Sequence, residues 1–423
     1  MRRERILKHF KKITSLPHCS GNAKALRSYL VDFATVKGYG VEVDMAGNIL
    51  IQKGSPSLVL QAHYDMVCVG RAPEIETYEK EGWLYAKESS LGADNGMAIA
   101  MMMLWMEQEA PLGFLLTSDE EIGLVGASAI SLKIDANYML NLDYEDEGIV
   151  CIGCAGGADL IAEQSFEPAE PLKYAYELEV SGLLGGHSGV EIHKDIPNAI
   201  KIMAEYLRDK VVRLAWAQGG ERRNSIPTRM VVRLSSDEVL LSNHWVKVTP
   251  LNEAVKVYET KSLIGLLNAF KHGVHAYNEA LNIPQVSINL AKIALEDGQV
   301  LIESSSRSMS DEELEQINTS TKALFSEYGF STKVEYKYPA WRPEETPFTQ
   351  LVKESMEEVF NMSRYEAIHA GLECGILQER YPHIAFVSIG PTIVSPHSTR
   401  ERVDLDSVDR TFEVVERIIS KLT

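Results

Sequence analysis

Histidine and carboxylate side chains stand at the ends of several short apolar segments of this sequence, separated by long stretches of chain. The set comprises His63, Asp94, Glu120, Glu121, Asp143 and His397. A single histidine is usually structural, and a single acidic residue after a strand is usually a helix cap. Caps alone do not account for a histidine or carboxylate at five separate segment ends. Imidazole and carboxylate without thiolate are typical ligands of Zn²⁺, with Mn²⁺ or Co²⁺ as substitutes.

The number of these ligands predicts two metal ions rather than one. A catalytic zinc usually has three protein ligands and one open position, so two histidines and three carboxylates exceed its needs. Two metals about 3.5–4 Å apart polarise a carbonyl and acidify a bound water. A further carboxylate must then accept the proton. Glu120 and Glu121 are adjacent, so one can bind metal while the other acts as base. Asp65, two residues after His63, can orient that imidazole.

The segments that carry these residues predict an α/β sheet. Short apolar strands are predicted at Leu58–Gln61, Gly113–Thr117 and Tyr138–Leu142, and a buried helix at Asn95–Glu107. Each candidate ligand lies at or just beyond the carboxyl end of a predicted strand, or in the following loop. That edge is where open α/β sheets bind ligands. The alternation of strand and helix predicts a layered α/β fold with helices on both faces of the sheet.

The middle of the chain has a different order of elements. A strand is predicted at Tyr174–Val180 and a long helix at Pro197–Leu214, and Ser310-x-x-Glu313 predicts a capping box that opens a later helix. After Pro339 the α/β alternation returns. The sequence therefore predicts a catalytic domain in two parts with an inserted α+β domain. The expected ranges are 1–172 and 343–423 for the catalytic domain and 173–342 for the insertion.

Several motifs around these residues resemble those of one family. They are Leu60–Val67, Leu91–Gly96, Asp119–Glu121, Gly153–Gly157, Gly185–Gly189, Glu191–His193 and His369–Gly375. These strings are similar to those of the aminoacyl-histidine dipeptidases (peptidase D type), within the wider group of co-catalytic zinc peptidases. The resemblance runs from about residue 5 to the end. It implies a three-layer α/β zinc-peptidase domain with an inserted α+β lid or dimerisation-like domain.

The resemblance also implies how the metal ligands are shared. His63 and Asp143 would hold one metal, Glu121 and His397 the other, and Asp94 would bridge both. The implied cofactor is two Zn²⁺ per chain, with Mn²⁺ or Co²⁺ as alternatives.

The implied reaction is hydrolysis of a dipeptide. A metal-bridged hydroxide would attack the peptide carbonyl, Glu120 would act as general base and then as acid, and Asp65 would orient His63.

Three residues of the inserted domain resemble the family's substrate-binding positions. They are His187, Asn224 and Arg307. His187 would reach the substrate carbonyl, where a donor stabilises the developing oxyanion. Asn224 and Arg307 would hold the free carboxylate end of the dipeptide, because a guanidinium binds a carboxylate bidentately. Closure of such a lid would exclude water.

Other functions remain open alongside the dipeptidase. An N-acyl amino acid deacylase would prefer substrates with a blocked α-amine, and a tripeptidase would accept longer ones. A metal-binding scaffold without activity is a further alternative, although such proteins often lose the base, and Glu120 is present. The side-chain preference is also open between Xaa-His and a broad range of dipeptides.

Composition limits the partners and the compartment. The formal net charge of −18 disfavours nucleic acid and anionic membranes as partners. The longest apolar run, Met97–Met106, is too short to span a bilayer. Five cysteines form an odd and sparse set, and Cys151-x-x-Cys154 is interpreted as a pair of buried free thiols. We expect a cytoplasmic protein that binds a small dipeptide, and the sequence leaves a homodimer open.

Overall fold

The computed structural model describes residues 2–422 and divides into two compact units. The first unit consists of the residues up to Cys154, Trp341–Ala367 and the residues from Leu372 onward. The second consists of Ala155–Ala340 and Ile368–Gly371. Within residues 2–422, no helix is both long and apolar enough to cross a membrane.

The unit boundaries differ from the domain boundaries expected from the sequence. The expected first boundary at 172–173 lies instead at 154–155. The reason is strand β9 (Gly156–Ser165), which pairs with β18 (Gln299–Ser308) on one side and β19 (Ser331–Tyr338) on the other. The second boundary lies at 340–341 rather than 342–343, and Ile368–Gly371 returns to the second unit.

A mixed eight-stranded sheet forms the centre of the first unit, in the order β1-β2-β6-β3-β7-β21-β8-β20. Its strands are β1 (Gly40–Val43), β2 (Ile49–Gln52), β3 (Leu58–His63), β6 (Gly113–Thr117), β7 (Tyr138–Asn141), β8 (Ile149–Cys154), β20 (Arg364–Ile368) and β21 (Ala385–Ser388). Strands β6, β3, β7 and β21 run parallel. Their carboxyl ends therefore meet at one edge, and the predicted α/β fold class is confirmed.

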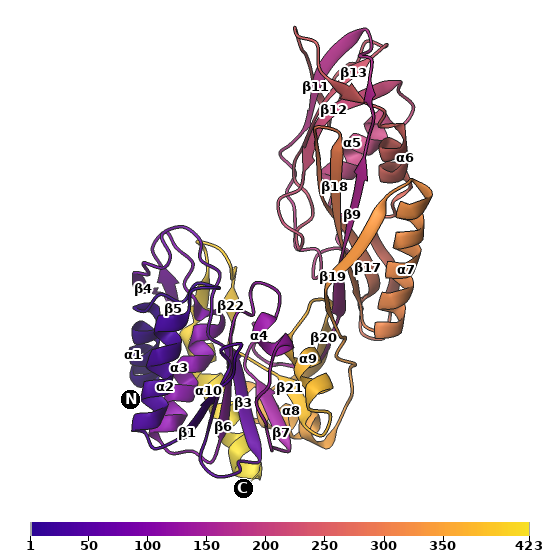
Figure 1. Ribbon diagram of the computed structural model, residues 1–423. Coiled ribbons are helices and arrows are strands. Elements are labelled where there is room, and N and C mark those ends of the chain that lie inside the picture. The colour runs from indigo at the N-terminus through magenta and orange to yellow at the C-terminus, as the bar shows by residue number, and fades with distance from the viewer. Residues whose placement is uncertain (1, 423) are drawn as a thin grey trace. The chain divides into compact units, whose positions relative to one another are not determined.

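The helices of the first unit surround this sheet, and most of them contribute to its apolar core. They are α1 (Arg2–Thr14), α2 (Lys24–Val36), α3 (Ala93–Glu107), α4 (Val125–Ser128), α8 (Pro347–Phe360), α9 (Glu373–Arg380) and α10 (Leu405–Leu422). Helices α1, α2 and α3 lie together on one side of the sheet (Figure 1). The whole of Met97–Met106 is buried, so α3 is a core helix. Thr346 caps α8 through a capping box with Thr349.

A small sheet in the first unit carries the loop of His397. Its strands, in the order β22-β23-β5-β4, are β4 (Thr77–Lys80), β5 (Trp83–Ala86), β22 (Ile393–Val394) and β23 (Arg402–Asp404). Strands β22 and β23 pair antiparallel, so the segment between them forms a hairpin loop. His397 lies in this loop with a positive φ of 56°.

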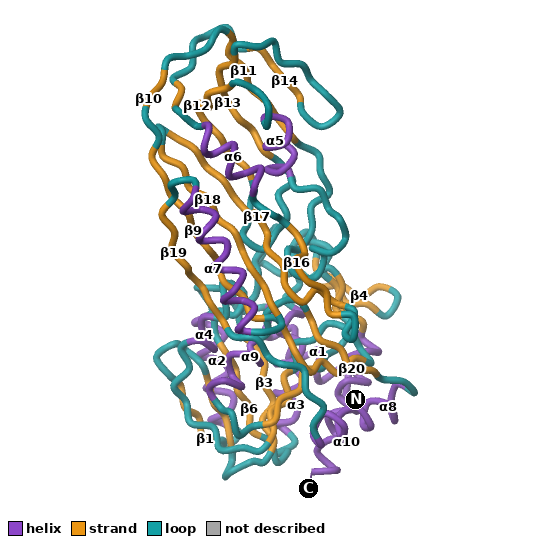
Figure 2. The backbone as a smooth tube through the Cα atoms, turned by 90° about the vertical axis from the view of Figure 1, so that its right-hand side faces the viewer, coloured by secondary structure: helices purple, strands orange, loops and turns teal. Residues whose placement is uncertain are grey.

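A nine-stranded sheet forms the second unit, in the order β14-β11-β13-β12-β17-β18-β9-β19, with β16 paired to β17. Its remaining strands are β11 (Tyr174–Val180), β12 (Val212–Gly219), β13 (Met230–Ser236), β14 (Lys247–Pro250), β16 (Gly273–Asn278) and β17 (Ile283–Glu296), and β10 (Pro168–Ala169) pairs with β15 (Val257–Tyr258) separately. Helices α5 (Ala199–Leu207), α6 (Lys261–Ala269) and α7 (Asp311–Glu327) cover one face of the large sheet (Figures 1 and 2).

Two local predictions in the second unit are wrong. The long helix expected at Pro197–Leu214 ends at Leu207, and strand β12 begins at Val212 and pairs with β13. Pairing within the sheet overrides helical periodicity at the β-branched Val211 and Val212. Ser310 occupies the N-cap position of α7, but its side chain makes no capping hydrogen bond.

The cysteines form one disulfide, between Cys19 and Cys68. Nothing in the sequence indicated this pairing across 49 residues. The fold brings the two together because Cys19 forms a β-bridge with Met66. Cys151, Cys154 and Cys374 are buried and form no disulfide, as interpreted for the Cys151-x-x-Cys154 pair.

Candidate metal centre and substrate residues

Four side chains from separate elements of the first unit meet around Asp94. The Asp94 Oδ1 atom lies 3.1 Å from His63 Nε2, and its Oδ2 atom lies 2.9 Å from His397 Nε2. His63 Nε2 is also 3.2 Å from Asp143 Oδ1, and His397 Nε2 is 2.9 Å from Glu121 Oε1. Asp94 is therefore shared by two pairs, each made of one histidine and one further carboxylate. The structure brings together all five residues predicted as metal ligands.

The residues of this cluster fit divalent cations. Ligand atoms of His63, Asp94 and Glu121 all lie within 4.8 Å of one another. Glu121 Oε1 and Asp143 Oδ1 are buried, and apart from the histidine nitrogens 2.9 and 3.2 Å away they have no hydrogen-bond partner among residues 2–422. Three buried carboxylates around two histidines are costly unless a cation is bound. Three carboxylates and two imidazoles without a thiolate match the preferences of Zn²⁺ and of related divalent ions.

The protonation of the cluster reflects its crowding. Burial, joined by the charge of Asp94, raises the pKa of Glu121 to about 7. Burial also raises the pKa of Asp143, against the opposing effect of His63. Although burial opposes it, hydrogen bonds from His397 and His63 lower the pKa of Asp94. Hydrogen bonds to Asp94 and Glu121 overcome burial and raise the pKa of His397 to about 12. The protonation of each carboxyl around Asp94 therefore depends on the charge of its neighbours.

The carboxylate of Asp65 lies closer to the backbone amide of Glu120 than to the imidazole of His63, which it was predicted to orient. His63 Nδ1 lies 3.0 Å from the carbonyl oxygen of Asp65, whereas the carboxylate oxygen Oδ1 lies 3.6 Å away. The carboxylate instead accepts hydrogen bonds from the backbone of Glu120 at 2.9 Å and of Glu121 at 3.4 Å. Ser20 Oγ donates to it at 2.7 Å. Asp65 therefore holds the Glu120–Glu121 turn in place.

Glu120 has the character of a base in a crowded acidic site. Burial, followed by the charge of neighbouring Glu121, raises the pKa of Glu120 well above the ordinary range. The turn that carries Glu120 follows β6, and its amides bond back to it: Gly123 N and Leu124 N donate to the Glu120 carbonyl. A raised pKa brings a carboxylate closer to the operating range of a general base.

Two buried glutamates that sequence analysis missed support the candidate ligands. Glu401 is 3% exposed and accepts hydrogen bonds from the backbone amides of Leu91, Gly92, Ala93 and Asp94, at 2.7, 3.1, 2.8 and 3.4 Å. Because Glu401 follows His397 by four residues, one carboxylate ties the loops of two ligands together. The only sequence signal is a glutamate near His397, which by itself indicates no contact.

The second missed glutamate, Glu373, contacts residues near the ends of strands β3 and β6. It is fully buried and accepts hydrogen bonds from Gln61 Nε2 and Thr117 Oγ1, both at 2.6 Å. Gln61 lies two residues before His63, and Asn141, two residues before Asp143, bonds to Gln61 in turn. Burial raises the pKa of Glu373 to about 7. This network links the ends of strands β3, β6 and β7, within two residues of the candidate ligands His63 and Asp143.

The three predicted substrate residues all lie in the second unit. His187 and Asn224 are in neighbouring segments, because His187 forms a β-bridge with Ser225 and Ser188 N donates to the Asn224 carbonyl at 2.8 Å. The His187 Nδ1 atom accepts hydrogen bonds from Gly189 N at 3.1 Å and Val190 N at 3.2 Å. A neutral His187 therefore carries its proton on Nε2, which makes that atom a donor.

Arg307 is a buried cation with an unused donor. It lies on β18 and is 7% exposed. Its Nη1 atom donates to the hydroxyl of Tyr338 at 2.7 Å. Its Nε atom is buried and has no hydrogen-bond partner among the residues that the structure describes. A buried guanidinium with an unpaired N–H group is suited to bind an anion.

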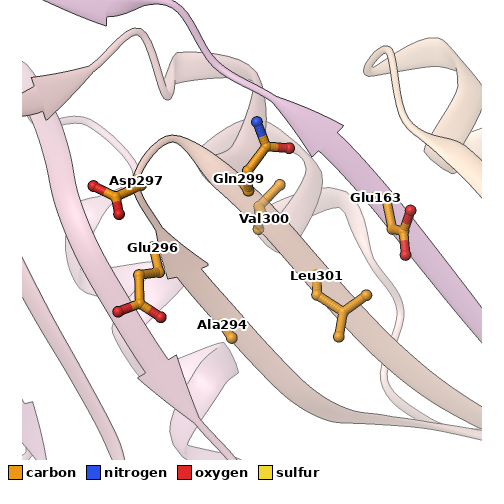
Figure 3. A pocket seen from close by; sticks show the side chains of 7 residues that line it. All are labelled: Glu163, Ala294, Glu296, Asp297, Gln299, Val300 and Leu301. Atoms are coloured by element: carbon orange, nitrogen blue, oxygen red, sulfur yellow. The ribbon is translucent and has the colours of Figure 1, made fainter.

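A depression elsewhere in the second unit contains none of these residues (Figure 3). It has a volume of about 480 Å³ and lies beside the β17–β18 turn. Its polar lining consists of Glu163, Glu296, Asp297 and Gln299. The carboxylates point in different directions in Figure 3 and no histidine is among the lining residues, so we assign it no role in the chemistry.

Comparison with known proteins then decides the family. Residues 59–421 match the model of peptidase family M20/M25/M40. The chain belongs to this family. It is therefore a peptide hydrolase, and the cluster around Asp94 is the candidate site of a metallopeptidase.

Individual relatives support this assignment along the whole chain. The cytosol non-specific dipeptidase of Escherichia coli (strain K12) is 32% identical, over 98% of this chain and 96% of that protein. The aminoacylhistidine dipeptidase from Vibrio alginolyticus has a similar structure, with a TM-score of 0.79 at 28% identity over 99% of this chain and 96% of that one. A tripeptidase from Staphylococcus aureus shares the fold, with a TM-score of 0.62 at 18% identity over 99% and 98% of the two chains.

Proposed function

We propose that this protein is a dipeptidase that uses two divalent metal ions, Zn²⁺ in the first place, with Mn²⁺ or Co²⁺ as substitutes. The observation that carries the proposal is the position of Asp94 between His63 and His397. The names and the identity of the two relatives above 25% support dipeptides as the substrate class.

The metal ions would be held by the two pairs around Asp94. His63 with Asp143 would bind one ion and His397 with Glu121 the other, and Asp94, which lies between the two histidines, would be shared by both ions. Such ions polarise a carbonyl and lower the pKa of a bound water. Glu121 Oε1 and Asp143 Oδ1 are buried, and apart from the neighbouring histidine nitrogens no donor in residues 2–422 reaches them.

Glu120 would move the proton in the reaction. It accepts a proton at its carboxylate as the nucleophile forms and passes that proton to the leaving amine. Asp65 keeps the base in position, because its carboxylate holds the Glu120 amide at 2.9 Å. The raised pKa of Glu120, caused by burial and by Glu121, supports this role.

The second unit would supply recognition. His187 Nε2, the donor nitrogen of a neutral imidazole, would stabilise the oxyanion. Asn224 and Arg307 would hold the free carboxylate of the dipeptide, and the unpaired Nε of Arg307 supports an anion site there. A carboxyl-terminal amide offers Arg307 no charge, so Arg307→Ala should weaken binding of free dipeptides far more than binding of their amides.

A substrate panel tests the proposal. Metal-loaded protein should cleave free dipeptides, β-alanyl-histidine or other Xaa-His pairs among them, faster than matched tripeptides or N-acetyl amino acids. Preferred cleavage of N-acetyl substrates would replace the proposal with a deacylase, and preferred cleavage of tripeptides with a tripeptidase. Absence of hydrolysis by protein that binds metal would identify a scaffold instead. Comparison of Xaa-His with other dipeptides in the panel decides between narrow and broad specificity.

We also propose a cytoplasmic location, supported by the name of the Escherichia coli relative and by three buried cysteines that form no disulfide. The Cys19–Cys68 disulfide is the observation that stands against it, because cytosolic disulfides are rare. Cell fractionation tests the location, and thiol labelling of freshly extracted protein tests whether the disulfide exists there. A homodimer stays part of the proposal, to be tested by the mass of the protein in solution.

A further inference from the structure

Arg307 lies in a row of paired residues that crosses four strands of the second sheet. Ser287 on β17 pairs with Arg307 on β18, Arg307 pairs with Gly157 on β9, and Gly157 pairs with Tyr338 on β19. Residues paired directly across a sheet project from the same face. Gly157, which has no side chain, is the residue that stands between Arg307 and Tyr338 in this row. The Tyr338 hydroxyl lies 2.7 Å from Arg307 Nη1.

Glycine at position 157 is required by this contact. A Cβ atom built there would lie 2.4 Å from the Tyr338 hydroxyl oxygen and 2.6 Å from ring atom Cζ. Any side chain at that position would therefore displace the phenol that reaches over it. The missing side chain lets Tyr338 cross the row and meet the guanidinium.

A second glycine, on another segment of the chain, limits the position of the Tyr338 ring. Gly371 belongs to the short stretch Ile368–Gly371 that returns to the second unit. A Cβ atom at Gly371 would lie 2.8 Å from Tyr338 Cε2 and 3.0 Å from its Cζ and hydroxyl. Two residues earlier in the same stretch, His369 Nε2 contacts Ser287 Oγ at 2.7 Å, at the other end of the row. The His369–Gly375 motif thus contributes to both ends of the Arg307 row.

We propose that Tyr338 is a positioning residue that sets the specificity for the free carboxylate by fixing the guanidinium of Arg307. The inference rests on the proposed role of Arg307. Arg307 Nη1 donates its hydrogen bond to the hydroxyl of Tyr338, so the edge of the guanidinium that carries Nε is left for the substrate. Nε is buried and has no hydrogen-bond partner within residues 2–422. A carboxylate binds such an edge through two parallel hydrogen bonds, so its affinity depends on the plane of the guanidinium. Gly157 and Gly371 form the slot that holds the phenol.

The test compares two tyrosines of strand β19. Tyr338→Phe removes the hydroxyl that contacts Arg307 and keeps the ring. Tyr336→Phe is the matched control, because Tyr336 is 57% exposed and its ring lies against Arg223 rather than Arg307. Each variant is assayed on a free dipeptide and on the amide of the same dipeptide, with metal content and thermal unfolding measured in parallel.

For Tyr338→Phe we expect KM for the free dipeptide to rise by roughly 10-fold, as for loss of a hydrogen bond to a charged group. KM for the amide should change less than about two-fold, and kcat and metal content should stay near those of the unmodified protein. Tyr336→Phe should leave both substrates unchanged. A merely structural role for Tyr338 would instead lower activity equally on both substrates, and that outcome overturns the inference.

Gly371→Ala provides a second perturbation of the same contact. It should reproduce the selective rise in KM, and adding Tyr338→Phe to it should cost little more, because both act through one hydroxyl. Full additivity of the two changes contradicts the proposed slot. If Arg307→Ala fails to distinguish dipeptide from amide, the proposed function of Arg307 is wrong. If Arg307→Ala distinguishes them but Tyr338→Phe does not, the error lies in the inference about Tyr338 alone.

Discussion

The candidate metal centre and the Arg307 row are held in place by different numbers of hydrogen bonds. Around Asp94, each ligand is fixed by a strand end or loop, and the buried carboxylates of Asp65, Glu373 and Glu401 tie those segments together. Arg307 has one hydrogen-bond partner for its guanidinium that the structure shows, the hydroxyl of Tyr338. The candidate metal centre is thus held by several hydrogen bonds, whereas the proposed anion site depends on a single contact.

This difference implies different sensitivities to mutation. Where several hydrogen bonds hold one group, loss of one is partly compensated by the rest. Where one bond holds the group, its loss changes the geometry directly. We therefore expect the first unit to tolerate the loss of a single supporting hydrogen bond and to lose its activity altogether only when a candidate ligand or the proposed base is removed.

The largest effect should come from removing the metal ions. Exhaustive chelation should abolish hydrolysis, because the proposed reaction depends on metal ions held by the five clustered residues, and Zn²⁺, Mn²⁺ or Co²⁺ should restore it. Elemental analysis of the reloaded protein should give about two ions per chain, as the ligand number implies. Full activity in protein shown to be free of metal would refute the metal centre.

Replacing the base should be the next largest effect. Glu120→Gln keeps the size of the side chain but cannot accept a proton, so kcat should fall by at least roughly 10²-fold while metal content is unchanged. Its matched control is the adjacent Glu121→Gln, which should lose metal. If instead Glu120→Gln lost the metal and Glu121→Gln kept it, the two roles would be exchanged.

The same contrast explains which parts of the site the sequence could predict. The clustering of all five candidate ligands could be predicted because histidines and acids after apolar strands are visible as residue types, and parallel strands bring their carboxyl ends to one edge. Glu401 could not be predicted, because its partners are four backbone amides whose position depends on the fold. Tyr338 was missed for a similar reason: its contact with Arg307 requires the register of three strands.

The fold class and the presence of an inserted domain could be predicted, but the first boundary of that insertion could not. The alternation of strands and helices gave the α/β class and several strands within a residue or two. The boundary at 172 was wrong because β9 continues directly from β8, with only Ala155 between them. Local pattern does not say which sheet a strand joins, since that choice depends on partners β18 and β19 far along the chain.

His187→Ala should separate the chemistry of the second unit from metal binding. Loss of one oxyanion donor should lower kcat by roughly 10²–10³-fold. Metal content should stay the same, because His187 is not part of the cluster. Its control is His193→Ala, a nearby histidine for which we assign no role and expect little change. A loss of metal on His187→Ala would contradict the division of labour between the units.

Glu401→Gln tests the support of the centre without touching a ligand. An amide offers one acceptor oxygen where the carboxylate offers two, so the amides of Leu91–Asp94 lose part of their cap. We expect metal affinity to fall by roughly 10–100-fold, as for other residues that orient ligands. Titration of the metal-free protein with Zn²⁺ measures this directly. Glu379→Gln, at an exposed position on α9, should leave the affinity unchanged.

Ser20→Ala should have the smallest effect, and it sharpens the comparison most. It removes the 2.7 Å hydrogen bond from Ser20 Oγ to Asp65, but the amides of Glu120 and Glu121 still hold that carboxylate. We expect kcat to fall by less than roughly 10-fold, the scale of one neutral-donor hydrogen bond that others back up. Tyr338→Phe also removes one hydroxyl, yet it should raise KM for free dipeptides by about 10-fold because no second bond from the described residues replaces it. A greater loss from Ser20→Ala than from Tyr338→Phe, measured as kcat/KM on the same dipeptide, would show that the metal centre is the more weakly supported region.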